Sequence, residues 1–290
     1  MHFEGSYVAL VTPFHGDGSV NFEKLRELVE WQISEGTDGI VALGTTGESS
    51  TMSHEEDDEV ARCVIDTVSG RIPVIVGAGS NSTQTQLEKG IKYQKMGADG
   101  LLLITPYYNK ANDEGMYRHF ATVADAVDTP ILLYNVPGRT GCSISPACMA
   151  RLALHPNIAG VKEASGNISY AADIARLVGD DFCMLSGNDD MIVPLMSLGA
   201  SGVISVLANV CPAASHEMTA AFLRGDVGAA RALQLQYLDL IHALVCEVNP
   251  IPVKEAMNQL GMAVGGYRLP LCEISAAGRA RVAQALEALR

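Results

Sequence analysis

The sequence predicts a closed barrel of eight parallel strands alternating with helices, followed by additional C-terminal helices. Two observations support this fold class. Short apolar runs alternate with amphipathic stretches at intervals of about 25 to 30 residues over most of the chain. The runs are continuous rather than alternating, as is typical of parallel strands that are covered on both faces. A doubly wound open sheet is the alternative architecture.

Eight apolar runs have the length and composition of buried strands. In chain order they are YVALVT (7–12), DGIVALG (38–44), IPVIVGAG (72–79), DGLLLIT (99–105), TPILLYNV (129–136), IAGVKEA (158–164), FCMLSGN (182–188) and SGVISVLAN (201–209). The stretches between them have helical periodicity. Residues 21–36 are an example, since one helical face carries Leu25, Leu28, Val29 and Ile33. Eight such units close into a (β/α)8 TIM barrel.

The strand pattern ends near residue 225, and only helical stretches follow, at 228–247, 252–261 and 274–290. We therefore expect a barrel domain over residues 1–225 and a C-terminal α-helical domain over residues 226–290. No long Gly/Ser-rich or charged linker separates the two parts.

Composition excludes several classes of protein. The formal net charge is −13, which disfavours a nucleic-acid partner because such proteins need a basic face. The chain has no run of about 18 apolar residues and no leader pattern, so we expect neither a membrane span nor a signal peptide. Its seven cysteines are scattered without CxxC spacing, which predicts buried free thiols rather than a zinc site. These features favour the reducing cytoplasm as the location of the protein.

Lys162 ends the sixth apolar run, where burying an ammonium group is costly. A parallel barrel carries its chemistry at the carboxyl ends of its strands, so this lysine is expected at the mouth of the barrel. Walls of low dielectric constant would lower its pKa and allow it to attack a carbonyl group, forming a Schiff base. An ordinary strand-end lysine with its amine in water is an equally good interpretation of this residue alone.

Other strand ends carry residues that would complete such a site. Tyr134 ends the preceding strand and could move protons, although a packing role is also open. The turn GTTGE (44–48) offers backbone N–H groups and the hydroxyls of Thr45 and Thr46 to a carboxylate or phosphate, although turn and cap roles are common for such residues. Arg139 could bind a second carboxylate or lie in solvent.

Three further motifs are weaker. The glycines of VGAGSNS (76–82) lack dinucleotide-binding spacing and are expected to form a tight turn. The acidic stretch HEEDDE (54–59) could attract a divalent ion, but a helix N-terminus stabilised by its dipole is favoured. The stretch CEVNPIPVKEA (246–256) is interpreted as structural, with its prolines turning the chain. We expect no metal site.

The motifs GTTGE, TPYYN, YNVPGRTG, KEASG, GVISVLANV and NPIPVK, in this order and spacing, resemble those of the dihydrodipicolinate synthase family. The likeness covers essentially the whole chain. Because KEASG and GTTGE also occur across the wider pyruvate-dependent class I aldolases, they specify mechanism more than substrate, and Arg139 narrows the choice. The resemblance implies a lyase of lysine biosynthesis that condenses pyruvate with L-aspartate 4-semialdehyde, without a metal or organic cofactor.

The resemblance also assigns catalytic roles. Lys162 would form the Schiff base, and Tyr134 would be the phenol that relays protons. Thr45 would link Tyr134 to Tyr108, which a neighbouring subunit donates in this family. Two aromatic rings in the loop TPYYNKANDEG (105–115) independently favour an interface. We therefore expect a homo-oligomer whose minimal active unit is a dimer. The resemblance implies that two such dimers form the tetramer that is usual in this family.

Substrate binding is implied in the same way. Thr46 and the amides of its loop would hold the pyruvate carboxylate, Arg139 would meet the carboxylate of the aldehyde, and the backbones of Gly187 and Ile204 would line the pocket. Two alternatives remain: an aldolase or lyase that uses the same imine with another electrophile, such as a sialic-acid lyase, and a non-catalytic barrel that binds keto acids.

The match is weaker for feedback regulation. Lysine-inhibited members of the family bind L-lysine at the dimer interface, and four residues fit that pattern, namely Ser49, His54, Asn81 and Tyr107. Asp57 stands where regulated enzymes often have a histidine, and Thr85 where they have a glutamate. The sequence therefore predicts weak or absent inhibition by L-lysine.

Overall fold

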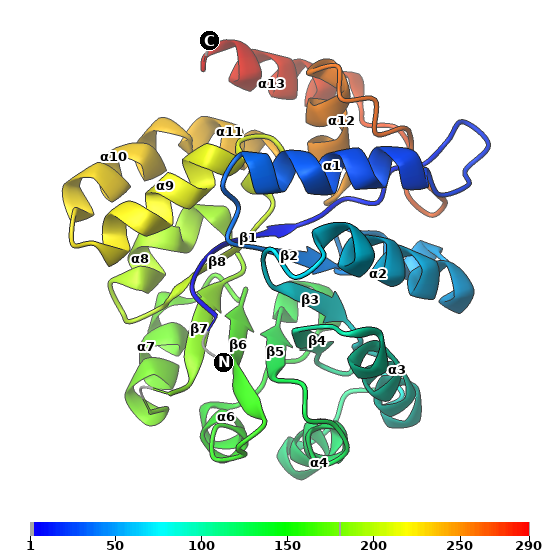
Figure 1. Ribbon diagram of the computed structural model, residues 1–290. Helices are drawn as coiled ribbons and strands as arrows, with labels where there is room; N and C mark the ends of the chain where they lie inside the picture. Colours follow the sequence, from blue (N-terminus) through cyan, green and yellow to red (C-terminus); the bar gives the residue numbers. More distant parts are fainter. Residues whose placement is uncertain (1–2, 180, 290) are drawn as a thin grey trace. The chain divides into compact units, whose positions relative to one another are not determined.

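The computed structural model describes residues 3–179 and 181–289. Within these residues, eight strands form a closed parallel barrel in chain order, with helices between successive strands (Figure 1). The predicted fold class is confirmed. None of the helices in the described residues combines the length and apolarity that a membrane span requires.

Each predicted apolar run contains or overlaps one observed strand, and every strand is shorter than its run. The strands are β1 (Gly5–Ala9), β2 (Gly39–Ala42), β3 (Val74–Gly77), β4 (Gly100–Ile104), β5 (Ile131–Asn135), β6 (Ile158–Glu163), β7 (Cys183–Ser186) and β8 (Gly202–Ser205). Only β1 is displaced, because it begins before the run predicted at 7–12. The prediction for β8 extended too far, since the short helix η3 occupies Leu207–Asn209.

The helices that follow the strands begin with polar caps in most cases. They are α1 (Phe22–Ser34), η1 (Ser49–Thr51), α2 (His54–Val68), α3 (Thr83–Met96), α4 (Asp113–Ala124), α5 (Pro137–Thr140), α6 (Pro146–Leu152), α7 (Ile168–Leu177), η2 (Asp189–Met191), α8 (Ile192–Met196) and α9 (Pro212–Leu223). At the start of α2, Ser53 and Glu56 form a reciprocal capping box. The acidic stretch 54–59 thus lies at a helix N-terminus, where the dipole favours negative charge.

The C-terminal region contains α10 (Val227–Gln236), α11 (Leu238–Ala243), α12 (Ile251–Gln259) and α13 (Ala276–Glu287). The structure divides the helical stretch predicted over 228–247 into α10 and α11 at Tyr237. The backbone of Tyr237 has φ −91° and ψ 0°, which departs from the angles of a regular α-helix, and hydrophobic periodicity does not register such a deviation. Arg290, the last residue of the predicted tail helix, lies outside the described residues.

The chain divides into two compact units. The first comprises Pro73–Ile204 and the residues before Ser6, and here α3, α4, α6 and α7 pack against one another in chain order. The second comprises Ser6–Ile72 and the residues from Ser205 onward, and here α1 packs on α2, α9 on α10, and both α11 and α12 on α13. The domain boundary near residue 225 remains a prediction.

Candidate active site

Lys162 and Tyr134 are register partners at the carboxyl ends of β6 and β5. The amine Nζ of Lys162 lies 4.5 Å from the centroid of the Tyr134 ring, and the two residues are only 7% and 6% exposed. A cation or amine is favourably placed over the face of an aromatic ring. The lysine is therefore largely shielded from solvent, which is the setting that Schiff-base chemistry needs.

Gly187 follows β7 and lies against the side chain of Lys162. A Cβ atom at this position would come within 2.6 Å of Cβ of Ala164 and 3.1 Å of Cε of Lys162. The amide of Gly187 donates a hydrogen bond of 2.7 Å to the carbonyl of Glu163, which fixes the approach of the two strand ends. Only a residue without a side chain fits here without displacing the lysine or its neighbours.

Glu163 and Asn135, which the sequence interpretation missed, join the same two strand ends. The carboxylate of Glu163 accepts hydrogen bonds from Nδ2 of Asn135 at 2.8 Å and from the amide of Ser165 at 2.7 Å. Burial raises the pKa of Glu163. Oδ1 of Asn135 in turn accepts from the amide of Ile144 at 3.1 Å. The available signal in the sequence was the polar residue that ends each of these two apolar strands.

Two other predicted site residues lie in this first unit. Arg139 is exposed in the short helix α5, which follows β5, so it lies near the same strand end as Tyr134. Ile204 is fully buried in β8. The position of Arg139 allows its guanidinium group to meet an anion arriving from solvent.

Tyr108 projects from the loop after β4 and is 92% exposed. Its backbone has φ 69°, a left-handed conformation that costs a non-glycine residue free energy. Asn81 and Asn109 hold this loop: Nδ2 of Asn81 donates to the carbonyl of Tyr107 at 3.2 Å, and Nδ2 of Asn109 donates to the carbonyl of Asn81 at 2.9 Å. The loop is thus a defined structure that presents the Tyr108 ring to solvent.

The turn Gly44–Glu48 lies in the second unit, directly after β2. A Cβ atom on Gly47 would lie 3.1 Å from the carbonyl oxygen of Leu10 and 3.2 Å from the amide nitrogen of Leu43. The hydroxyl of Thr12 donates a 2.6 Å hydrogen bond to the carbonyl of Gly47. The turn is therefore packed tightly against neighbouring backbone at Gly47, which accounts for the glycine at that position.

Asn249 contacts this turn from the segment that leads into α12. Its Nδ2 atom donates a hydrogen bond of 2.9 Å to Oγ1 of Thr46, which is 3% exposed. Thr45 is half-buried beside it. Asn249 belongs to the stretch 246–256, which the sequence interpretation treated as structural, so this contact with a candidate binding residue was missed.

Glu48 and Lys254 form a fully buried ion pair at the end of the same turn. Nζ of Lys254 lies 2.6 Å from Oε1 of Glu48, and both side chains are 0% exposed. The amine also donates to the carbonyl of Gly266 at 2.7 Å and lies 4.3 Å from the centroid of the Phe14 ring. Burial lowers the pKa of Lys254. The signal for this pair in the sequence was a lysine within the largely apolar stretch 251–257, most of which is buried in the structure.

The four residues predicted to bind an effector are divided between the units. Asn81 and Tyr107 are hydrogen-bonded to each other in the first unit. Ser49 lies in η1 and His54 is exposed at the start of α2 in the second unit. Asp57, at the position where regulated enzymes often have a histidine, is only 1% exposed.

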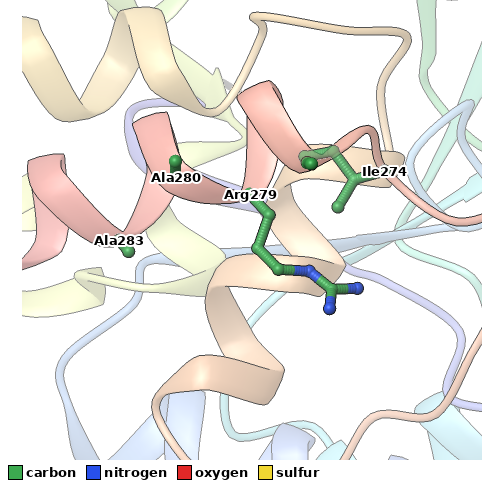
Figure 2. A pocket seen from close by; sticks show the side chains of 5 residues that line it. Ile274, Arg279, Ala280 and Ala283 are labelled. Carbon is green, nitrogen blue, oxygen red and sulfur yellow. The ribbon is translucent and has the colours of Figure 1, made fainter.

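A surface pocket of apolar character lies on α13, and none of the predicted site residues lines it. It is lined by Ile274, Ala276, Arg279, Ala280 and Ala283. Figure 2 shows Arg279 extending away from the helix, and its guanidinium group pairs with Glu255 at 3.2 Å. The pocket contains no group suited to covalent chemistry.

Comparison with known proteins gives one consistent result. The model of the dihydrodipicolinate synthetase family matches residues 2–289. The 4-hydroxy-tetrahydrodipicolinate synthase of Thermoanaerobacter sp. (strain X514) is 54% identical over 274 residues, which cover 94% of this chain and 92% of the relative. The chloride-inhibited dihydrodipicolinate synthase of Acinetobacter baumannii, solved with pyruvate, has a TM-score of 0.96 and 43% identity, and the match covers 99% and 98% of the two chains. The synthase of Cyanidioschyzon merolae, solved with lysine bound, has a TM-score of 0.96 and 41% identity, with coverage of 100% and 99%.

Proposed function

The chain belongs to the dihydrodipicolinate synthetase family, and we propose that it acts as a 4-hydroxy-tetrahydrodipicolinate synthase. It is a lyase of the class I aldolase type, which joins pyruvate to L-aspartate 4-semialdehyde in the first committed step of lysine biosynthesis. The observation that carries this proposal is the shielded amine of Lys162 over the Tyr134 ring at the ends of β6 and β5.

The chemistry begins at Lys162. Its neutral amine attacks the ketone carbon of pyruvate, and loss of water gives an iminium ion. Loss of a proton from the methyl group then gives an enamine, whose carbon attacks the aldehyde. The amine of the semialdehyde finally attacks the iminium carbon, which closes the ring and releases Lys162. The iminium nitrogen accepts the electron pair in the enamine step, so the proposal needs neither a metal nor an organic cofactor.

These steps require proton transfers, for which we assign Tyr134 as the relay. Its contact with Lys162 supports that role, because a phenol hydroxyl can both donate and accept a proton. Thr45 would link Tyr134 to Tyr108 of a neighbouring subunit. The exposed ring and strained backbone of Tyr108 support a function between subunits rather than within one.

Substrate carboxylates are assigned to two positions. Thr46 and the amides of its turn would hold the carboxylate of pyruvate, and Arg139 would bind that of the semialdehyde. The backbones of Gly187 and Ile204 would line the pocket. Close contact of Gly187 with the Lys162 side chain supports its place there.

Assembly and location follow from the same proposal. We propose a homodimer as the smallest active species, a tetramer of two dimers as the complete enzyme, and the cytoplasm as its location. Thr85 lacks the carboxylate that would bind an effector ammonium group, a hydrogen bond of about 1.5 to 3 kcal/mol, and Asp57 is buried. Weak or absent inhibition by L-lysine is the expected result, and half-inhibition at sub-millimolar L-lysine would contradict it.

Borohydride reduction in the presence of pyruvate tests the Schiff base. Peptide mass mapping should place the reduced adduct on Lys162 and not on the second buried lysine, Lys254. The variant Lys162→Ala should give no adduct. No adduct on the wild-type enzyme would point to a keto-acid-binding barrel without catalysis, whereas an adduct without turnover of L-aspartate 4-semialdehyde would point to another electrophile. A coupled assay with the reductase of the next step measures that turnover.

A further inference from the structure

The contact between Asn249 and Thr46 determines how the threonine hydroxyl can be used. A hydroxyl group has one proton to donate and two lone pairs to accept with. Nδ2 of Asn249 donates to Oγ1 of Thr46 at 2.9 Å, so one lone pair of the hydroxyl is occupied by an amide nitrogen, which cannot accept the hydroxyl proton. The proton of Thr46 must therefore point away from Asn249 and remains available to an acceptor.

A second contact fixes the same turn two residues later. The fully buried ion pair between Glu48 and Lys254 connects the turn to α12, and Lys254 is tied in addition to the carbonyl of Gly266. Asn249 and Lys254 lie on either side of the start of α12, which begins at Ile251. The C-terminal region thus holds the turn at Thr46 and at Glu48.

We propose that Asn249 is a positioning residue that makes Thr46 a dedicated hydrogen-bond donor to the carboxylate of a small 2-oxo acid, with the Glu48–Lys254 pair holding the turn in register. This inference rests on the proposed function of the turn as the carboxylate site. A carboxylate can only accept hydrogen bonds, so a threonine whose proton is already directed outward binds it without reorientation. The neutral amide of Asn249 achieves this without placing a negative charge beside the substrate.

The variant Asn249→Asp is the sharpest test. Its carboxylate would accept the Thr46 proton and repel the keto acid. We expect the KM for pyruvate to rise about 10- to 100-fold, the range for one charge-assisted hydrogen bond, while kcat at saturation changes much less. The pyruvate concentration that gives half-maximal borohydride trapping should rise by the same factor.

Asn258→Asp is the matched control at the other end of α12. The side chain of Asn258 hydrogen-bonds to backbone atoms: its Nδ2 donates to the carbonyl of Gly265 and its Oδ1 accepts from the amide of Val264, each at 2.9 Å. This variant should lose thermal stability without a change in KM. Asn249→Gln, which keeps an amide donor, should recover part of the affinity that Asn249→Leu loses.

A double-mutant cycle with Thr46→Val separates positioning from general damage to the fold. If Asn249 acts through the hydroxyl, Asn249→Leu should raise KM in the wild-type background and have little further effect when Thr46 is valine. Equal factors in both backgrounds, or an unchanged KM in Asn249→Asp, would overturn the inference. Failure of the wild-type enzyme to form any pyruvate adduct would instead overturn the proposed function.

Discussion

The amine of Lys162 lies over the face of the Tyr134 ring, 4.5 Å from its centroid, and both side chains are almost completely shielded from solvent. This relationship separates two contributions of the tyrosine. The ring packs against the lysine, whereas the hydroxyl is the group that can carry a proton. A substitution that keeps the ring and removes the hydroxyl can therefore measure the second contribution alone.

We expect Tyr134→Phe to lower kcat by about 100- to 1,000-fold, as for loss of a general acid–base group, with little change in thermal stability. Steady-state kinetics and thermal denaturation check this. Tyr170→Phe is the matched control, because its hydroxyl donates to the carbonyl of Ile144 at 2.6 Å and has no assigned chemistry. The control should lose stability and keep kcat; equal kcat losses in the two variants would contradict the relay.

Tyr108 is expected to act in the site of a neighbouring subunit. Tyr108→Phe and Lys162→Ala should each be nearly inactive as pure proteins. When the two are mixed under conditions of subunit exchange, hybrid dimers should regain activity, because one of their sites then combines a native Lys162 with a native Tyr108. Activity is measured in the coupled assay before and after mixing. Absence of recovery, with exchange verified by mass, would place Tyr108 outside the partner's site.

Gly187→Ala should damage the protein because the new Cβ atom would overlap Ala164 and press on Lys162. We expect a loss of about 1 to 3 kcal/mol in the free energy of unfolding, together with slower adduct formation. Gly179→Ala provides the comparison, since nothing lies within 4 Å of the Cβ atom built there. Chemical denaturation and the rate of borohydride trapping measure the two effects, and a Gly187→Ala variant as stable and reactive as Gly179→Ala would refute the steric argument.

The buried pair Glu48–Lys254 should show strong coupling. Lys254→Met leaves a carboxylate buried without its counter-charge, so we expect a loss of about 3 to 5 kcal/mol in the free energy of unfolding. The double variant Glu48→Gln/Lys254→Met removes both charges and should be clearly more stable than Lys254→Met alone. Denaturant unfolding of the wild-type protein, these two variants and the single variant Glu48→Gln tests this, and additive losses would mean that the two charges do not interact.

Stability at low pH should depend on Glu56. Its hydrogen bonds to the Arg268 guanidinium group lower the pKa of Glu56 from 4.5 to about 2. Because this folded-state pKa is below the unfolded one, the carboxylate stabilises the protein above pH 4.5 and loses that effect as pH falls towards about 2. Wild-type protein should therefore be more stable than Glu56→Gln at pH 7, with the difference shrinking over that window. A difference that stays constant with pH would contradict this assignment.

The barrel could be predicted from sequence because parallel strands covered on both faces are continuous apolar runs, and the eight runs have barrel spacing. Lys162 could be singled out because a charge at the end of such a run is costly. The contacts of Asn249 and Lys254 could not, because their partners lie 203 and 206 residues away. A polar residue's partner depends on which segments meet in space, which local periodicity does not encode.

The ion pair at Glu48 has a consequence for any attempt to shorten the chain. A truncation before Asn249 would delete the cation that neutralises a carboxylate inside the fold, and with it the amide that faces Thr46. Helix α12 is therefore not a detachable cap, and shortened versions of the protein for crystallography or biocatalysis need to retain the chain through at least the Gly266 carbonyl.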